Sequence, residues 1–511
     1  MRSDSLARLR AALLAGLTAV SLPLAAAAQA PAQPPASAAA PHAGTPAAEA
    51  IRPLPPDATT RHSLDLPGRI LRFTATAGSL RLTDAQGRPQ ADIAYTDYRL
   101  DGTEPRRRAV TFVVNGGPGA SSAWLQLGAM GPWRVRMGGE AGLPSAPLEL
   151  LPNAETWLDF TDLVFIDPAG TGFSRLARPG EELRRRFWSV EGDIRSLAEV
   201  IRRWLERNGR LASPKFLVGE SYGGFRGPRL VRALEAEEGI GIRGLVLISP
   251  VLEFGHGAAF DPLSLAARLP SMVAAARAGA GTLTRAEMAE AEAYAVGDYL
   301  ADLLRGQRDP EAIARMSDRV AALTGLDPAL VRRWHGRLRM DDFLRGIGRR
   351  EGRVASPYDA TVTGPDPFPL AAVSRHPDPV LDALVAPLTS AMLDLYGTHL
   401  NWQPEGRRYE LLNRSTSREW DWGHGRTPPE SVSALREALA LDTHRHVLVA
   451  HGLFDLVTPY FGTELILRQI PASVGADRIT FLTYRGGHMF YAMDTSRAGL
   501  REEARALIEA R

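Results

Sequence analysis

The sequence predicts an α/β fold whose central sheet is mostly parallel and flanked by helices. The first observation is a series of short, continuous apolar runs, which suit strands buried on both faces. The second is that segments with helical periodicity, at 194–208 and 224–237, lie between these runs. The runs expected as strands are residues 109–114, 162–167, 216–218, 245–248, 446–450 and 479–484.

The N-terminus has the pattern of a signal peptide over residues 1–28. Three arginines precede an apolar stretch at 11–24, and small residues follow it at 25–30. Pro31 makes cleavage directly after Ala30 unfavourable, so we expect cleavage at the Ala27 or Ala28 bond. An uncleaved anchor is the alternative. The apolar stretch is short for a bilayer span. We therefore expect an exported protein, periplasmic or extracellular, without stable membrane insertion after cleavage.

Composition divides the rest of the chain. Residues 29–56 are rich in proline and alanine and predict a linker without a core. Strand patterns at 70–76 and 92–98 open the first part of the sheet-containing core, expected at 57–255, and the second part is expected at 441–511. Between them, 256–440 predicts a mostly helical cap insertion. Its expected helices are 266–276, 285–304 and 310–323.

Charge and cysteine content exclude several functions. The 511 residues carry 60 basic and 58 acidic side chains, a formal charge of +2, and no basic block stands out. We therefore expect no nucleic-acid partner. The chain has no cysteine, which rules out disulfides, thiolate metal sites and a cysteine nucleophile. No metal or other cofactor is expected, and nothing in the sequence selects an oligomeric state.

The strongest local motif is Gly219-Glu220-Ser221-Tyr222-Gly223, which fits G-x-S-x-G. It follows an apolar strand and precedes a helical segment, which is the context of a nucleophile elbow. The turn is so tight that the neighbours of the serine must be small residues, which explains Gly219 and Gly223. Ser221 would then stand exposed at the carboxyl edge of the sheet, as the nucleophile of an α/β-hydrolase fold.

A serine nucleophile needs a base and a carboxylate that orients it. In this fold the order along the chain is serine, acid, histidine. His488 follows a late apolar strand, and Asp455 also comes just after a strand, so both suit these roles. The rivals for the base are His256, His424 and His451, and the rivals for the acid are Asp442 and Asp494.

The segment Asn115-Gly116-Gly117-Pro118-Gly119 ends an earlier strand. A glycine-rich loop at this place can direct backbone N–H groups at a developing oxyanion. Phosphate binding is the rival interpretation. It fails because no Gly-Lys-Ser/Thr follows and Pro118 removes a donor.

With these residues the chain resembles the serine carboxypeptidases, also called the carboxypeptidase C or cathepsin A-like family of serine peptidases. Five segments match in the family's order and are spread over roughly residues 62–495. The opening hairpin and the arginine-rich insertion look most like the bacterial, exported branch. The matching segments are Asn115–Ser122, Asp167–Ser174, Gly219–Gly224, the segment around Asp455, and Gly487-His488-Met489.

The resemblance implies a serine-type carboxypeptidase that releases C-terminal residues from peptides through an acyl-enzyme. Its catalytic triad would be Ser221, Asp455 and His488. The resemblance further assigns the oxyanion hole to the N–H groups of Gly117 and Tyr222. It assigns recognition of the substrate's C-terminal carboxylate to Asn115, Gly116 and Glu220.

The chain departs from the family at two positions. Ala120 stands where many relatives have a disulfide cysteine, and Ala129 where many have a second carboxylate-binding glutamate. One alternative is that Arg134 or Arg136 replaces this glutamate and binds the carboxylate directly. The rival functions are an esterase or acyltransferase on the same scaffold and a catalytically inactive binding protein. Asn115 and Glu220 favour a carboxypeptidase over an esterase, and an intact triad argues against an inactive protein.

Overall fold

The computed structural model describes residues 52–510, apart from 139–142, 147–148, 255–260, 281–282, 372–375 and 426. The predicted signal peptide, most of the predicted linker and the rival base His256 lie outside the described residues. None of the helices in the described ranges has the length and apolar character needed to cross a membrane.

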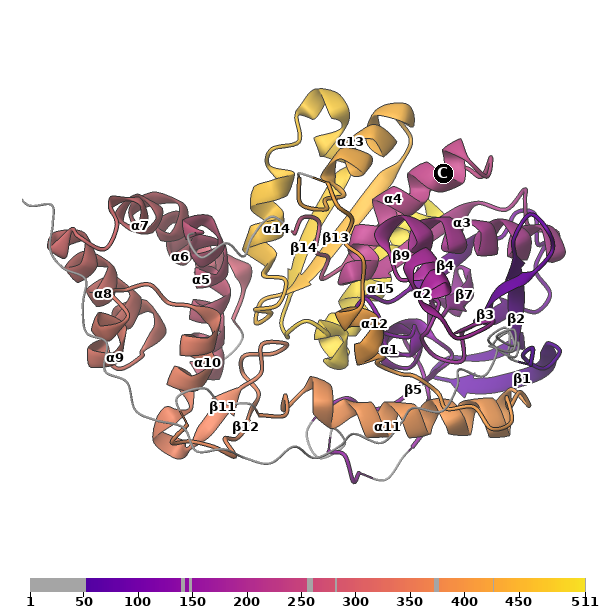
Figure 1. Cartoon of the computed structure of the whole chain (residues 1–511), viewed down its shortest axis with the longest axis horizontal. Coiled ribbons are helices and arrows are strands. Elements are labelled where there is room, and N and C mark those ends of the chain that lie inside the picture. The colour runs from indigo at the N-terminus through magenta and orange to yellow at the C-terminus, as the bar shows by residue number, and fades with distance from the viewer. Residues whose placement is uncertain are drawn as a thin grey trace, which may run out of the picture. The chain divides into compact units, whose positions relative to one another are not determined.

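One mixed sheet of ten strands organises the chain, in the order β1-β2-β3-β7-β4-β9-β10-β13-β14, with β8 paired to β3. Its second half, from β7 onward, is parallel, whereas β1, β2 and β3 form an antiparallel meander (Figure 1). The strands are β1 (Ala58–Leu66), β2 (Arg69–Thr83), β3 (Pro89–Leu100), β4 (Val110–Val114), β7 (Asp162–Ile166), β8 (Arg175–Leu176), β9 (Lys215–Glu220), β10 (Gly244–Ile248), β13 (His446–Gly452) and β14 (Ile479–Tyr484).

Burial explains why the apolar runs form these strands. Every residue of β4, β7, β9 and β10 is buried, as expected for parallel strands covered on both faces. β14 lies at the edge of the sheet, and most of its residues are only half-buried. The prediction of an α/β-hydrolase fold with a mostly parallel central sheet is confirmed.

Helices cover both faces of the sheet. Along β4 and β9, alternate residues enter different apolar clusters, because neighbouring side chains of a strand point to opposite faces. Phe112 and Leu217 pack on the face with α3, α4 and α13, whereas Val113 and Val218 pack on the face with α15 and η1. These elements are α3 (Val190–Arg207), α4 (Tyr222–Ala236), α13 (Val432–Leu441), α15 (Asp494–Glu509) and the π-helix η1 (Gln126–Met130).

The segment between β10 and β13 is mainly helical. Its helices α5 to α10 share a third apolar cluster, which also includes Leu453, Phe454 and Leu456 from the loop after β13. Figure 1 shows α5 to α10 grouped together. The helices are α5 (Pro262–Arg277), α6 (Ala289–Tyr294), α7 (Leu300–Arg305), α8 (Pro310–Thr324), α9 (Pro328–Arg333), α10 (Met340–Ile347), α11 (Leu381–Asp394) and α12 (Arg414–Arg418).

Two features of this segment differ from the pattern in the sequence. The helix expected at 285–304 is divided into several short helices, and Gly297 within it has non-helical angles of φ −99° and ψ −112°. Glycine tolerates such angles because it has no Cβ. A small two-stranded sheet, β11 (Arg353–Ala355) with β12 (Thr363–Pro365), was not predicted. Strands of three residues are too short to show alternation.

The remaining short elements connect these layers. They are α1 (Ala123–Leu125), α2 (Glu181–Phe187), α14 (Tyr460–Leu467), β5 (Trp133–Arg134), β6 (Leu151–Pro152), η3 (Trp157–Asp159), η4 (Ala278–Ala280), η5 (Arg285–Met288), η6 (Ala295–Tyr299), η7 (Arg349–Glu351), η8 (Leu395–His399), η9 (Ala472–Val474), η10 (Ala476–Arg478) and η11 (Phe490–Ala492).

Candidate active site

Ser221 occupies a strained turn between β9 and α4. Its φ of 59° and ψ of −120° are unusual for a residue with a side chain. The flanking glycines have no room for a side chain: a Cβ on Gly219 would lie 2.0 Å from the oxygen of Gly223, and one on Gly223 would lie 2.4 Å from the oxygen of Val114. This close packing is the physical reason for small residues on both sides of the serine.

The other candidate residues follow neighbouring strands at the same edge of the sheet. Asn115 follows β4 directly, Asp455 lies in the loop after β13, and His488 lies in the loop after β14. These strands run parallel to β9, so their carboxyl ends meet at one edge. In α/β sheets this edge is where ligands bind.

Asp455 and His488 form a buried pair. The Nδ1 atom of His488 lies 2.7 Å from Oδ2 of Asp455. Oδ1 of Asp455 accepts hydrogen bonds from the backbone N–H groups of Val457 and Thr458, at 2.8 and 3.0 Å, and Oδ2 accepts one from Oγ1 of Thr458 at 2.7 Å. Four donors therefore surround a fully buried carboxyl group, an arrangement that fixes the orientation of the His488 ring.

Neighbouring charges raise the pKa of His488. Burial alone would lower the pKa of this imidazole, but the charge and hydrogen bond of Asp455, with a contribution from Glu220, raise the pKa above its ordinary value. The ring of Tyr358 packs edge-on against the imidazole, with the ring centres 5.5 Å apart. The backbone N–H of His488 donates to the oxygen of Tyr358 at 2.5 Å.

Ser221 and His488 are linked indirectly, through hydrogen bonds to the last residue of β10 and to the residue that follows it. The N–H of Ser221 donates to the oxygen of Ile248 at 3.0 Å, and Oγ of Ser249 donates to the oxygen of His488 at 2.7 Å. Within the described ranges, Oγ of Ser221 makes no hydrogen bond. Catalytic hydrogen bonds are often long in a site without substrate and tighten when substrate binds.

Glu220 lies beside this pair in a different environment. Nδ2 of Asn115 donates to its Oε2, and the hydroxyl of Tyr491 lies 2.9 Å from Oε1 and 3.1 Å from Oε2. Burial raises the pKa of Glu220 to about 7, although His488, Tyr491 and Asn115 act to lower it. The carboxyl group is therefore largely protonated below neutral pH.

The glycine-rich loop packs directly on the elbow. A Cβ on Gly116 would lie 2.6 Å from the backbone N of Tyr222 and 2.9 Å from Cβ of Ser221. Tyr222 begins α4, whose first N–H groups have no acceptor within the helix. Gly117 has a φ of 103°, a conformation that favours glycine. The loop thus packs against Ser221 at Gly116, and the N–H groups of Gly117 and Tyr222 stay the predicted donors of an oxyanion hole.

A buried ion pair contacts the backbone at the start of this loop. Nε of Arg226 lies 2.6 Å from Oδ2 of Asp193, and both side chains are almost fully buried. The same guanidinium donates to the backbone oxygens of Asn115 and Gly116 and stacks on the ring of Tyr222 at 4.6 Å. Arg226 therefore fixes the backbone that leads into the glycine-rich loop.

The segment 167–174, which contributes to the family resemblance, makes structural hydrogen bonds. Oδ1 of Asp167 accepts the backbone N–H of Ser122 at 2.8 Å, and Oγ of Ser174 accepts that of Ala94 at 2.7 Å. A Cβ on Gly172 would lie 1.8 Å from Oδ2 of Asp167. Burial raises the pKa of Asp167 to about 7. The segment holds the end of the glycine-rich loop against the sheet.

The alternative candidates for the base and the acid that the structure describes lie in different environments. His451 is fully buried, both ring nitrogens lack a hydrogen bond within the described ranges, and burial lowers its pKa to about 4. His424 is exposed. Asp442 accepts the backbone N–H of His444 in a turn, and Asp494 binds Arg497 at 2.7 Å. None of these four is hydrogen-bonded to another candidate residue in the described part of the chain.

The arginines proposed as replacements for a second glutamate face different groups. Arg134 lies 3.9 Å from Asp494, and burial and the nearby Arg497 lower its pKa. Ala129 is buried on η1, and its oxygen accepts a hydrogen bond from Asn153. Tyr491, which was not predicted from the sequence, contacts Glu220 together with Asn115.

An apolar cavity of about 680 Å³ opens beside His488. Gly487 and Met489, the neighbours of His488, contribute to its wall, together with residues of the segment between β10 and β13. Its apolar side chains include Met137, Val362, Val380, Leu384, Met489 and Met493. Arg353 and Asp359 also line it. The cavity has room for a large apolar side chain next to His488.

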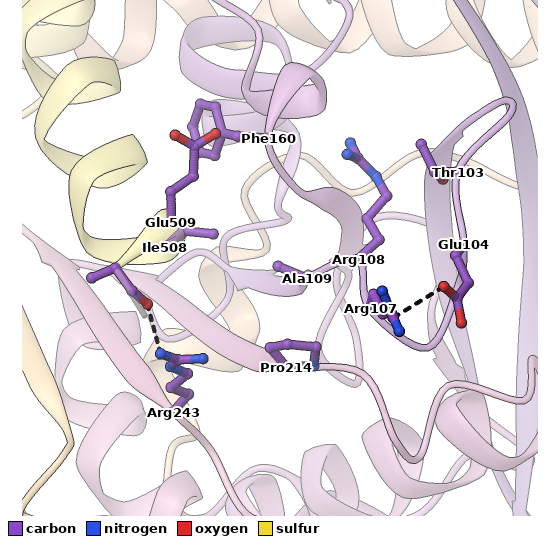
Figure 2. A pocket seen from close by; sticks show the side chains of 11 residues that line it. Thr103, Glu104, Arg107, Arg108, Ala109, Phe160, Pro214, Arg243, Ile508 and Glu509 are labelled. Carbon is purple, nitrogen blue, oxygen red and sulfur yellow. Dashed lines mark hydrogen bonds and ion pairs between the residues drawn. The ribbon is translucent and has the colours of Figure 1, made fainter.

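A second hollow, of about 540 Å³, lies at the opposite edge of the sheet. Figure 2 shows Ala109, Pro214 and Arg243, which precede β4, β9 and β10, along its wall. Arg243 donates to the oxygen of Ala510 at 2.6 Å, and Arg107 pairs with Glu104. Arg108 pairs with Asp162 and Glu509 with Arg505, outside the hollow. The hollow lies at the end of the strands away from Ser221. Across the described residues, no group of three His, Asp or Glu side chains could hold a metal ion.

Comparison with known proteins supports the family resemblance. Residues 96–254 match the family model described as serine carboxypeptidase. Over this part of its length the chain is similar to the serine carboxypeptidases. The resemblance inferred from the motifs is confirmed, whereas membership of its bacterial branch stays a prediction.

The related proteins match only part of the chain. Serine carboxypeptidase-like 8 of Arabidopsis thaliana is 28% identical over 29% of the chain and 34% of its own length. The pheromone-processing carboxypeptidase KEX1 of Komagataella phaffii is 32% identical over 34% of the chain and 26% of its own length. The chain thus spans about a third or less of these relatives. Proline iminopeptidase of Mycobacterium smegmatis, a solved structure, is 13% identical over 84% of the chain and 99% of its own, with a TM-score of 0.35.

Several residues of the site were not found from the sequence. Thr458 contacts Asp455, His488 and the oxygen of Ser249 through one hydroxyl. The only sequence signal for it is its position three residues after Asp455. Arg226 and Asp193 had a clearer signal, since each interrupts the buried face of an amphipathic helix. Tyr491 had only its place three residues after His488.

Proposed function

We propose that this chain is a serine-type carboxypeptidase that releases C-terminal residues from peptides. Ser221 is the nucleophile, His488 is the base and then the acid, and Asp455 orients His488. The N–H groups of Gly117 and Tyr222 form the oxyanion hole. Asn115, Gly116 and Glu220 receive the C-terminal carboxylate of the substrate.

The reaction has two stages. Oγ of Ser221 attacks the carbonyl carbon of the last peptide bond while Nε2 of His488 takes the hydroxyl proton. The C–N bond breaks as His488 passes this proton to the leaving amino group. Water, deprotonated by His488, then attacks the acyl-enzyme, and Ser221 recovers its proton. The oxyanion formed in each stage is stabilised by backbone donors already in place.

The observation that carries the proposal is the buried Asn115–Glu220 pair next to the elbow. An amide and a protonated carboxyl group are both hydrogen-bond donors to a carboxylate. A hydrolase acting on neutral esters has no need of a buried acid kept neutral at this place. The pair therefore favours a substrate that ends in a free carboxylate.

The cavity beside His488 suggests the preferred leaving residue. Tyr491 links Glu220 to η11, and Met489 and Met493 on either side of η11 line the cavity. A terminal carboxylate held at Glu220 would direct the side chain of the same residue into this space. We propose that the enzyme prefers large apolar residues at the C-terminus.

We also propose that the insertion caps the site, with boundaries near 256 and 440. Tyr358 of this segment contacts His488 through both its ring and its backbone oxygen. On the other side of the elbow, the backbone N–H of Asn413 donates to the oxygen of Gly119 at 2.7 Å. Insertions placed over the carboxyl edge of a sheet commonly control access to the site.

A paired substrate experiment tests the proposed activity. A peptide ending in a free phenylalanine and its amidated twin are incubated with the enzyme, and the products are identified by mass spectrometry. Faster release of the last residue from the free peptide than from its amidated twin supports a carboxypeptidase. Equal cleavage of both peptides and of small esters would favour the esterase or acyltransferase alternative. No turnover with any of them would favour an inactive binding protein. Ser221→Ala is the blank for all substrates.

Export is the remaining part of the proposal. The pattern at 1–28 supports a signal peptide that directs the protein to the periplasm or the medium. Sequencing the N-terminus of the protein recovered from these fractions gives the cleaved bond. An intact Met1 in the mature protein would contradict cleavage.

A further inference from the structure

Tyr491 makes the closest contact to Glu220 that has no place in the proposed mechanism. Its hydroxyl lies 2.9 Å from Oε1 and 3.1 Å from Oε2 of Glu220. The tyrosine is fully buried, and Glu220 is 2% exposed. Asn115 already occupies Oε2. Together Asn115 and Tyr491 contact both oxygens, which leaves the carboxyl group little freedom to rotate.

The surrounding structure makes room for this tyrosine. The short helix η11 brings its ring against η1, where a Cβ on Gly128 would lie 2.7 Å from Cε2 of Tyr491 and 2.6 Å from Sδ of Met137. Nη1 of Arg497 donates to the backbone oxygen of Tyr491 at 3.1 Å. Gly128, Arg497 and the helical turn thus fix the ring with its hydroxyl at Glu220.

We infer that Tyr491 is a positioning residue for Glu220, fixing the orientation of its carboxyl group and setting the pH range in which peptides with a free C-terminus are bound. The inference rests on the proposed role of Glu220 in receiving the substrate's carboxylate. Nothing in it requires Tyr491 to touch the substrate.

The direction of the pH effect follows from the hydrogen bond. A hydroxyl donates to the ionised carboxylate and can accept from the protonated form, and the charge-assisted bond is the stronger one. Tyr491 therefore favours ionised Glu220 and lowers its pKa, as do His488 and Asn115, whereas burial and Asp455 raise it. Burial and the Glu220 carboxyl in turn raise the pKa of Tyr491, so the hydroxyl keeps its proton across the working range.

Tyr491→Phe removes the hydroxyl and keeps the ring. For a peptide with a free C-terminus we expect two changes. KM at acid pH rises several-fold while kcat changes little, because the orientation of Glu220 is lost. The alkaline limb of kcat/KM moves upward by about one pH unit, the size expected for one charge-assisted hydrogen bond. The amidated peptide should show neither change.

Two further variants separate positioning from general damage. Gly128→Ala pushes the ring away from Glu220 and should move the alkaline limb in the same direction. Tyr484→Phe is the matched control: this ring stacks on Phe490, the neighbour of Tyr491, and loss of its hydroxyl should leave both profiles in place. In a Glu220→Gln background, Tyr491→Phe should no longer move the limb. An unchanged limb and KM in Tyr491→Phe, or equal changes for free and amidated peptides, would overturn the inference.

A measurement independent of turnover keeps this inference apart from the proposed function. Infrared titration of full-length Ser221→Ala from pH 4 to 9, minus that of Ser221→Ala/Glu220→Gln, isolates the carboxyl band of Glu220. Adding Tyr491→Phe should shift its midpoint upward by about one pH unit. If the wild type cleaves no peptide but the midpoint shifts, the proposed function fails and the contact with Glu220 stands. A midpoint that does not move overturns the inference even if the enzyme is a carboxypeptidase.

Discussion

Two carboxyl groups, Asp455 and Glu220, lie in one site but in opposite environments. Asp455 accepts four hydrogen bonds, two of them from backbone N–H groups, and pairs with His488. Glu220 has only the donors Asn115 and Tyr491, and burial raises its pKa to about 7. The number of donors, rather than the depth of burial, distinguishes these two groups, since both are almost fully buried.

The comparison shows that two buried carboxyl groups in one site can have very different numbers of hydrogen-bond donors. Hydrogen-bond donors stabilise a carboxylate, whereas burial without enough donors favours the protonated form. Environments that separate two titratable groups in this way often mark different chemical roles. The Asp455 side of the site would serve proton transfer, and the Glu220 side would serve substrate recognition. The following experiments test that division.

Loss of the nucleophile or the base should have the largest effect. We expect Ser221→Ala and His488→Ala each to lower kcat by about 10⁶-fold, because neither residue acts without the other. Single-turnover and steady-state assays measure the loss, and a fluorophosphonate probe should label Ser221 alone. Ser433→Ala and His424→Ala, at exposed positions, are the controls. More than about a thousandth of activity in Ser221→Ala would contradict the mechanism.

Breaking the ion pair between Arg226 and Asp193 should have the second largest effect, a loss of stability. Arg226→Gln leaves Asp193 buried without its partner, and we expect the free energy of unfolding to fall by about 3–5 kcal/mol. Urea unfolding measures the change. Arg185→Gln, which breaks an exposed pair with Glu181, should cost less than about 1 kcal/mol. Similar losses in the two variants would mean that Arg226 is not what fixes the loop.

The pH profiles of the free and the amidated peptide should distinguish the titration of His488 from that of Glu220. His488 must be neutral to act as a base, so kcat/KM for the amidated peptide should rise with pH through a pKa above the ordinary histidine value and then stay level. Glu220 must be protonated to receive a carboxylate, so kcat/KM for the free peptide should fall by up to about tenfold per unit above pH 7.

Glu220→Gln tests the same division. An amide donates without titrating, so the alkaline fall for the free peptide should flatten while the amidated peptide is unaffected. Because Glu220 and His488 influence one another, the limbs belong to the coupled pair rather than to one residue. Superimposable profiles for the two peptides in the wild type would remove the proposed role of Glu220 and would favour recognition by Arg134 or Arg136.

Stability should depend on pH through the same group. A glutamate side chain in water has an ordinary pKa of 4.5, whereas burial raises the pKa of Glu220 to about 7 in the fold. The native state therefore binds more protons between these values, and the free energy of unfolding falls as pH rises through this window. Glu220→Gln should reduce this fall relative to the wild type, measured by urea unfolding at pH 4, 6 and 8. An identical slope in both proteins would place the pKa of Glu220 near its ordinary value.

A charge at the mouth of the apolar cavity should have the smallest effect. Val362→Asp should lower kcat/KM about tenfold for a peptide ending in phenylalanine and leave hydrolysis of a small ester unchanged. Val296→Asp is the matched control, because Val296 is 40% exposed, Val362 is 39% exposed, and Val296 does not line the cavity. If both substrates lose activity equally in Val362→Asp, the cavity does not receive the leaving residue.

The strands and the elbow were predictable because their signals are local. The runs that form β4, β7, β9 and β10 are continuous and apolar since both faces of each strand are buried. The long helix expected at 285–304 was wrong as a continuous helix, because single-sequence periodicity does not register one glycine with non-helical angles. β11 and β12 are held by contacts within the insertion and are too short to carry a pattern.

The candidate site divides in the same way. Asp455 and His488 could be selected because each follows an apolar strand in the order expected for this fold. Their distance of 2.7 Å, and the hydroxyl of Thr458 between them, depend on how β13 and β14 pair. The role of Arg226 also depends on a contact across more than 100 residues.

By itself the sequence determined the tight turn at Ser221 and which apolar runs form strands, because steric room at Gly219 and Gly223 and burial of successive residues act on neighbours in the chain. Only the tertiary structure decided that Tyr491 meets Glu220, 271 residues away, and that this glutamate is kept largely neutral below pH 7. Protonation depends on how much water and how many donors surround a group. Both are set by residues that folding brings together from distant parts of the chain.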